Sequence, residues 1–215
     1  MGRLLRIAGE LLVTCGVIVF GFLAYMYWGT ALRASNAQQT YTSQLTRQWS
    51  DANDPLAALA SLGTISSGTP FALLRIPQFG HAWQLAVVQG TGVPQLLLAP
   101  GHVPGTALPG EVGNFAVAAH RVTAGNPFWL LPSLRKGSMI EVETIAATYE
   151  YEVTSRPTWV PASDLGALAA VPFHPGEPAS RRLITLITCD PPWTGTSRVI
   201  VTGVLVRTLP RPPGG

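Results

Sequence analysis

The chain from residue 71 onward consists of short apolar runs separated by glycine- and proline-rich turns. One run, 149–153, alternates strictly between apolar and polar residues, which predicts a strand with one solvated face. Helical periodicity is scarce in this part, and only 128–134 and 163–170 favour a turn or two of helix. Eight short runs at fairly even spacing predict an all-β barrel or sandwich. The predicted strands are 72–76, 85–88, 95–98, 115–119, 139–144, 149–154, 183–188 and 199–206.

A different pattern precedes this region, because residues 11–28 form an apolar run of 18 residues without a charge. A helix of that length spans roughly 27 Å, close to the hydrocarbon core of a bilayer. Arg3 and Arg6 precede the run, so the positive-inside rule predicts residues 1–10 in the cytoplasm and the rest of the chain outside. A cleaved signal peptide is the alternative, but its apolar region is typically only ~7–15 residues long. We therefore expect a single-pass membrane anchor.

The remaining sequence divides by texture into three parts. Residues 29–70 are polar and predict an unstructured extracellular tether, within which 35–49 has a faint helical pattern. The strand-rich region, 71–208, is long enough to form one domain. Residues 209–215 are rich in proline and glycine and predict a disordered tail. A mean hydropathy of +0.28 agrees with a chain that is partly in a membrane.

The two cysteines cannot pair with each other in this arrangement. Cys15 lies inside the predicted membrane helix and Cys189 lies in the outer domain. The outer domain therefore carries one unpaired thiol in an oxidising compartment, where a reactive role is the first hypothesis to test. An inert, buried cysteine is the alternative.

Three side chains stand where strands end and could carry chemistry. Cys189 follows the apolar strand 183–188, Arg198 comes nine residues later, and His120 follows the strand 115–119. A thiolate is the nucleophilic form of cysteine, and a nearby imidazolium favours it. A guanidinium keeps its charge and can stabilise a developing oxyanion. Taken singly, a histidine at a strand end is more often structural, and an arginine beside a strand is usually a surface charge.

Other kinds of site find little support in the sequence. A net charge of +3, scattered along the chain, does not favour nucleic-acid binding. One cysteine with scattered His81, His102, His120 and His174 lacks the spacing of a zinc site, so no metal is expected. The glycine-rich pieces lack a phosphate-loop pattern, and turns account for them.

The motifs resemble those of the sortase family of membrane-anchored cysteine transpeptidases. Residues 185–189, Thr-Leu-Ile-Thr-Cys, match the TLxTC signature, and Arg198 follows at the expected distance. Residues 113–121 match the stretch that carries the catalytic histidine, although Ala119 replaces the usual glycine. The segments 99–110 and 120–128 resemble the class E sortases of actinobacteria, with Ala99 in place of a glycine. The resemblance covers about 71–206.

This resemblance implies an eight-stranded β-barrel and a reaction. Cys189 would attack the Thr–Gly carbonyl of a Leu-Ala-x-Thr-Gly or Leu-Pro-x-Thr-Gly sorting signal on a secreted protein and form a thioester. His120 would protonate the leaving amine, and Arg198 would stabilise the oxyanion or hold the substrate backbone. Thr188 and Ala118 are the expected groove contacts. A peptidoglycan precursor would supply the acceptor amine, and no cofactor is expected.

Two departures and two alternatives accompany this interpretation. Asp190 follows the cysteine, and a carboxylate there disfavours the thiolate unless it points to solvent. Asp54-Pro55 is faintly similar to the lid of pilus-building class C sortases, although a helix start is the favoured interpretation. A pilin-polymerising sortase is therefore one alternative. A non-catalytic, membrane-tethered β-domain that binds wall peptides is the other.

Overall fold

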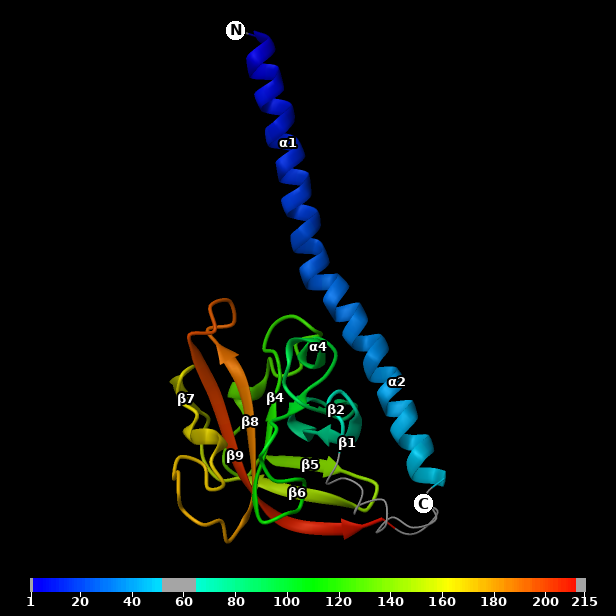
Figure 1. Cartoon of the computed structure of the whole chain (residues 1–215), viewed down its shortest axis with the longest axis vertical. Helices are drawn as coiled ribbons and strands as arrows, with labels where there is room; N and C mark the ends of the chain where they lie inside the picture. Colours follow the sequence, from blue (N-terminus) through cyan, green and yellow to red (C-terminus); the bar gives the residue numbers. More distant parts are fainter. Residues whose placement is uncertain (1, 52–64, 212–215) are drawn as a thin grey trace.

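A computed structural model describes residues 2–51 and 65–211 of the chain. It consists of a β-barrel with a long helical rod along one side (Figure 1). The expectation for Asp54-Pro55 lies outside the described residues. The strands are β1 (Pro70–Arg75), β2 (Gln84–Gln89), β3 (Gly101–His102), β4 (Gly113–Ala118), β5 (Met139–Glu143), β6 (Ala147–Val153), β7 (Thr158–Pro161), β8 (Arg182–Asp190) and β9 (Ser197–Pro210).

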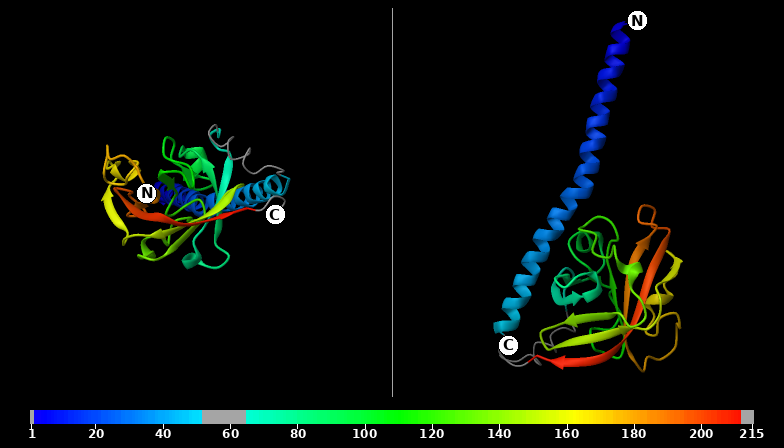
Figure 2. Two further views of the ribbon diagram at one scale, coloured as in Figure 1. Left: turned by 90° about the horizontal axis from the view of Figure 1, so that it is seen from below. Right: turned by 180° about the vertical axis from the view of Figure 1, so that it is seen from behind.

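The sheet closes on itself. The strand order is β6-β5-β1-β2-β3-β4-β8-β9-β7, and β6 also pairs with β9. Eight strands therefore form the ring, and β7 is attached outside it through its antiparallel pairing with β9. This confirms the predicted mainly-β, eight-stranded barrel, which Figure 2 shows along the direction of the helical rod.

The alternating pattern along β6 shows why these segments form a barrel. Its residues are buried and half-buried in strict alternation, with Tyr149, Tyr151 and Val153 pointing inward. In a strand successive side chains point to opposite faces, so one face fills the interior. Phe115 of β4 and Ile184 of β8 are also fully buried in the same core.

The strand predictions hold for seven of the eight runs, and the run 95–98 is the exception. It begins in the single helical turn α4 (Val93–Leu96), because Pro94 sits in the first turn, where its missing N–H is no loss. The sequence pattern did not reveal β3, which has two residues, or β7, which is mostly exposed. The two predicted helical segments each contain one short 3-10 turn. Within 2–51 and 65–211, the 3-10 turns are η3 (Pro77–Phe79), η4 (Leu131–Ser133) and η5 (Gly166–Leu168).

Helix α2 (Thr30–Asp51) packs against the barrel, which differs from the unstructured tether expected for 29–70. Leu45 and Trp49 are buried in a small cluster with residues of β1 and β2. The Gln38 side chain accepts a hydrogen bond from the Ala86 N–H (2.6 Å) and donates to the carbonyl oxygens of Ala86 (3.2 Å) and Leu98 (3.3 Å). Strand β3 pairs only with Val88 and Gln89 of β2, and Gln38 of α2 supplies the hydrogen-bond partners for Ala86 further along the same strand.

The rod continues from α2 toward the N-terminus without a break. Helix α1 (Gly2–Ala24) is joined to α2 by a π-helical turn, η1 (Tyr25–Gly29). The side chains of α1 are exposed, and its length and hydropathy suffice to cross a membrane. In both views of its length it extends well beyond the barrel (Figures 1 and 2).

Candidate active site

The parallel pairing of β4 with β8 brings the predicted histidine to the predicted cysteine. Ala118 pairs with Ile187, and the Ala119 N–H donates to the Ile187 carbonyl oxygen at 3.1 Å. The pairing has a constant offset of 69 residues, the same as that between Ala119 and Thr188. Carried one residue further, the register places His120 opposite Cys189. Both side chains therefore stand at the carboxyl ends of neighbouring parallel strands.

The antiparallel pairing of β8 with β9 brings the third side chain to the same place. Cys189 is the direct cross-strand partner of Arg198. Directly opposed residues on neighbouring strands have Cβ atoms about 4.5–5.5 Å apart and project to the same face. Cys189 thus lies between the strand that leads to His120 and the strand that carries Arg198. The three residues predicted to react are therefore neighbours.

The β8–β9 loop fixes the guanidinium of Arg198. Its Nη1 donates to the carbonyl oxygens of Gly195 (2.7 Å) and Ser197 (3.0 Å). Gly195 has φ = +61°, in the left-handed region, and a Cβ built there would lie 3.7 Å from Cys189 Sγ and 3.8 Å from Arg198 Nη1. The loop therefore passes close to both side chains, and glycine at this position leaves the space beside the thiol open.

The two predicted groove contacts differ in their surroundings. Thr188 is only 2% exposed, and its hydroxyl donates to the Ala119 carbonyl oxygen at 2.8 Å. That bond joins β8 to the end of β4, one residue before Cys189 and His120. Ala118 is half-buried. Contact of either residue with a substrate stays a prediction.

The four histidines fall into distinct classes. His120 is half-buried, and burial lowers its pKa below the usual 6.5, which favours the neutral imidazole. His102 is 2% exposed and lies against Phe71 and Phe115 in the core. Its Nδ1 lies 2.7 Å from Gln89 Oε1 and its Nε2 lies 2.9 Å from Thr106 Oγ1. Burial lowers the pKa of His102 as well, despite opposing hydrogen bonds. Its packing and hydrogen bonds within the core indicate a structural role.

His81 and His174 are exposed and belong to other parts of the barrel. Only His120 among the four therefore follows the strand that neighbours Cys189.

The carboxylate beside the cysteine is paired, which the sequence did not indicate. Asp190 forms an ion pair with Arg121 and accepts a hydrogen bond from the Trp159 indole N–H at 2.9 Å. Arg121 follows His120 just as Asp190 follows Cys189, so the β4–β8 register could have revealed the pair. The ion pair offsets the carboxylate charge next to the thiol.

An apolar groove borders this site. Its volume is about 560 Å³, and residues of the loops after His120 and Cys189 form one wall. Phe79 and Trp83, from the segment between β1 and β2, form part of the other wall. The groove is lined by Phe79, Trp83, Val122, Gly125, Asn126, Pro127, Trp129, Leu130 and Trp193. Val122 and Trp193 are close in sequence to His120 and Cys189, although neither His120, Cys189 nor Arg198 itself lines the groove.

A closed β-barrel with a thiol between an imidazole and a guanidinium at one end has the groups that thiol-dependent acyl transfer requires. Residues 74–206 match the sortase domain family. Since the match covers well over half of the chain, the chain belongs to the sortase family, whose members are cysteine transpeptidases.

Named relatives agree with the class E resemblance. Sortase SrtE1 of Streptomyces coelicolor is 32% identical over 97% of this chain, which spans 59% of that relative's length. A sortase E structure from Streptomyces avermitilis is 35% identical, covers 69% of this chain and 98% of its own, and has a TM-score of 0.62. A structure of Sortase E1 from Streptomyces coelicolor, with a tripeptide in the active site, is 32% identical over 69% of this chain and 94% of its own, with a TM-score of 0.61.

Proposed function

We propose that this chain is a membrane-anchored transpeptidase that cleaves a Leu-Ala/Pro-x-Thr-Gly sorting signal between Thr and Gly. It then transfers the secreted protein to an amine of a cell-wall precursor. The observation that carries the proposal is the double register of β8, which puts His120 on one side of Cys189 and Arg198 on the other. A relative holds a tripeptide in its active site, which supports a peptide substrate.

In the first half-reaction, the neutral imidazole of His120 takes the thiol proton of Cys189. The thiolate attacks the threonine carbonyl carbon, and the guanidinium of Arg198 stabilises the oxyanion that develops. The C–N bond to glycine then breaks, and the imidazolium returns its proton to the leaving amine. A thioester between Cys189 and the threonine remains.

In the second half-reaction, the acceptor amine attacks the thioester carbonyl carbon. His120, neutral again, accepts the amine proton, and the C–S bond breaks as the new amide forms. The lowered pKa of His120 suits this step, because the imidazole is mostly unprotonated near neutral pH. The proton finally returns to the thiolate of Cys189.

The apolar helix α1 is proposed as a single-pass anchor. Its hydropathy fits a membrane span, and Arg3 and Arg6 at its start favour a cytoplasmic N-terminus. The barrel would then be extracellular, where secreted proteins and wall precursors meet.

A cleavage and transfer assay with the full chain in detergent tests the proposal. Quenched Leu-Ala-x-Thr-Gly and Leu-Pro-x-Thr-Gly peptides are the substrates, with a short amine as acceptor. Cleavage between Thr and Gly, abolished in Cys189→Ala and His120→Ala, is the expected result. An inert Cys189 and no cleavage of either peptide, in a folded protein, would favour a non-catalytic peptide-binding domain. Transfer to a pilin lysine alone would favour a pilin-polymerising enzyme.

A further inference from the structure

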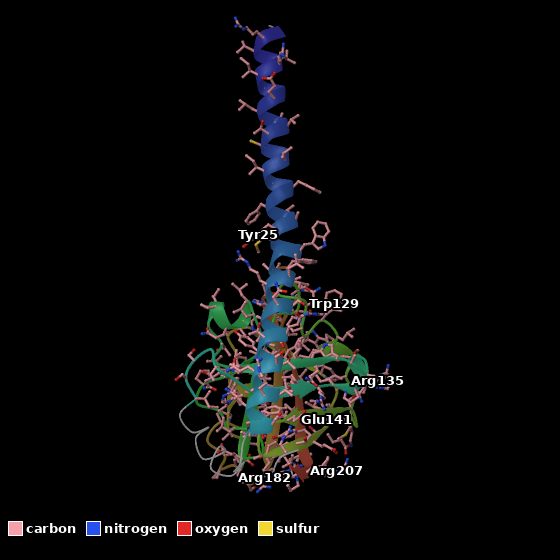
Figure 3. The ribbon with its side chains drawn as sticks, turned by 90° about the vertical axis from the view of Figure 1, so that its right-hand side faces the viewer. Tyr25, Trp129, Arg135, Glu141, Arg182 and Arg207 are labelled. Carbon is pink, nitrogen blue, oxygen red and sulfur yellow. The ribbon has the colours of Figure 1, made fainter. Side chains whose placement is uncertain are left out.

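The reacting end of the barrel lies on the side from which α1 extends. The β8–β9 loop, drawn in orange in Figure 1, is at the end of the barrel nearest α1. In Figure 3, Trp129 is the labelled barrel residue nearest Tyr25 along the rod, whereas Arg182 and Arg207 lie at the opposite end. The loops around the reacting residues therefore face the proposed membrane.

One hydrogen bond sets the height of these loops relative to the apolar helix. The Ala124 N–H donates to the Thr30 hydroxyl at 3.3 Å, and Ala124 lies between His120 and Trp129 in the chain. Thr30 is two residues beyond Trp28, the last residue of the apolar run 11–28 that is predicted to span the membrane, which corresponds to about 3 Å along a helix. The polar headgroup layer extends about 5–8 Å beyond the hydrocarbon core on each side. The loop after His120 is thus level with the headgroup layer.

The side chains exposed at this level are of the kind that membrane interfaces favour. Trp193 in the β8–β9 loop is 78% exposed, Trp129 is 49% exposed and Leu130 is 42% exposed. Trp28, in the turn between α1 and α2, is 62% exposed. Tryptophan concentrates at the headgroup level because its ring is apolar and its N–H seeks a polar partner.

The orientation of the barrel relative to α1 is fixed, because α2 continues α1 and is docked on the barrel. The three hydrogen bonds of Gln38 and the burial of Leu45 and Trp49 hold the helix against β1 and β2. A flexible tether would let the barrel turn any face to the bilayer. A docked helix that continues into the span presents one end only.

We propose that this end of the barrel rests on the lipid surface, with Trp193 and the Trp129-Leu130 pair seated among the headgroups. The proposal rests on the proposed role of α1 as a membrane span. The apolar groove then opens at the level of the bilayer. A peptide held at the membrane surface reaches the thiol without leaving that surface.

Spin labelling of the full chain in vesicles of phosphatidylcholine and phosphatidylglycerol tests the proposal. Nitroxides are attached to single cysteines at Trp193→Cys and Trp129→Cys, in a background with Cys15→Ser and Cys189→Ala. Collisions with dissolved oxygen, which enters lipid, and with a water-soluble nickel chelate report the depth of each label. We expect both labels to lose collisions with the nickel chelate and to gain collisions with oxygen when the protein enters vesicles.

Two further labels make the outcomes distinguishable. Val112→Cys is the matched control, because Val112 is 53% exposed and lies beside Arg182 and Arg207 at the opposite end. It should remain as accessible to nickel as in detergent. Ile18→Cys reports the span itself. If the Ile18 label is in lipid but the two tryptophan-site labels match the Val112 label, the membrane-facing proposal is wrong although the anchor stands.

Other outcomes have equally definite meanings. A water-exposed Ile18 label overturns the anchor and the facing together. Labels at Trp193 and Trp129 that become shielded only when a sorting peptide is added assign the surface to peptide and overturn the lipid contact. In the unlabelled protein, brominated lipids should quench part of the tryptophan fluorescence. The quenched fraction should be smaller in Trp193→Phe than in the wild type. No change in that fraction would also contradict the proposal.

Discussion

The hydroxyl of Thr188 donates to the carbonyl oxygen of Ala119 at 2.8 Å, one residue before Cys189 and His120. We expect Thr188→Val to leave that carbonyl without its buried donor, at a cost of about 1–3 kcal/mol in the free energy of unfolding. A small displacement of His120 should lower kcat/KM by about ten- to a hundredfold in the peptide assay. Thr188→Ser keeps the hydroxyl and should restore most activity. Equal rates for Val and Ser would show that the bond does not position the site.

The Arg121–Asp190 ion pair should matter for the reactivity of the thiol. In Arg121→Gln the Asp190 carboxylate loses its cationic partner beside Cys189, which disfavours the thiolate. Alkylation of Cys189 by iodoacetamide at neutral pH should slow by about three- to tenfold. Adding Asp190→Asn should return the rate toward wild type. Arg181→Gln, an exposed arginine at the other end of the barrel, is the control, and equal slowing there would refute a local effect.

Two histidines should make the fold less stable in mild acid. Burial lowers the pKa values of His102 and His120, so the unfolded chain binds these protons at higher pH than the folded protein. Above about pH 6.5, the pKa of histidine in the unfolded chain, the two histidines do not reduce the free energy of unfolding. As the pH falls below that value, the free energy of unfolding decreases.

Urea unfolding at about pH 7.5 and 5.5 measures this effect, since carboxylates titrate mostly below that range. The wild type should lose stability between the two values, and His102→Gln should lose less. His81→Gln, at an exposed position, should follow the wild type. An unchanged pH dependence in His102→Gln would show that the core histidine is not the source.

The docking of α2 should depend on Gln38. Gln38→Ala removes the partner of the Ala86 N–H and of two carbonyl oxygens, which should cost about 1–3 kcal/mol. Hydrogen exchange at Ala86 and along α2 should accelerate in the full chain. Gln39→Ala, at the exposed neighbouring position, is the matched control. If exchange is the same in both variants, packing of Leu45 and Trp49 alone holds the helix.

The barrel could be predicted from sequence because its strands alternate or end in clear turns, as 149–153 does. Strand ends also predicted that Cys189, His120 and Arg198 could act together, and the strand register brings the three to one end of the barrel, while their chemical roles stay predictions. The run 95–98 was misassigned because a short apolar run has no period of its own, and Pro94 decides for a helical turn.

For a related reason, the faint helical pattern at 35–49 did not predict the full length of α2 or its docking on the barrel. Its inward face is Ala34, Gln38, Leu45 and Trp49, which have helical spacing but include a small and a polar residue. A hydrophobic pattern cannot reveal that Gln38 bonds to Ala86, because that contact depends on how far β3 extends. The Arg121–Asp190 pair likewise depends on register, which is a property of two strands together.

The 69-residue offset between β4 and β8 also has a kinetic meaning. Cys189 and His120 lie far apart in sequence, and pairings of such high contact order form slowly and late. The thiol therefore acquires His120 as a neighbour only when β4 pairs with β8, whereas Arg198 is nine residues away and needs only the β8–β9 hairpin. The alkylation rate of Cys189 during refolding is consequently a clock for the pairing of β4 with β8, readable without any substrate.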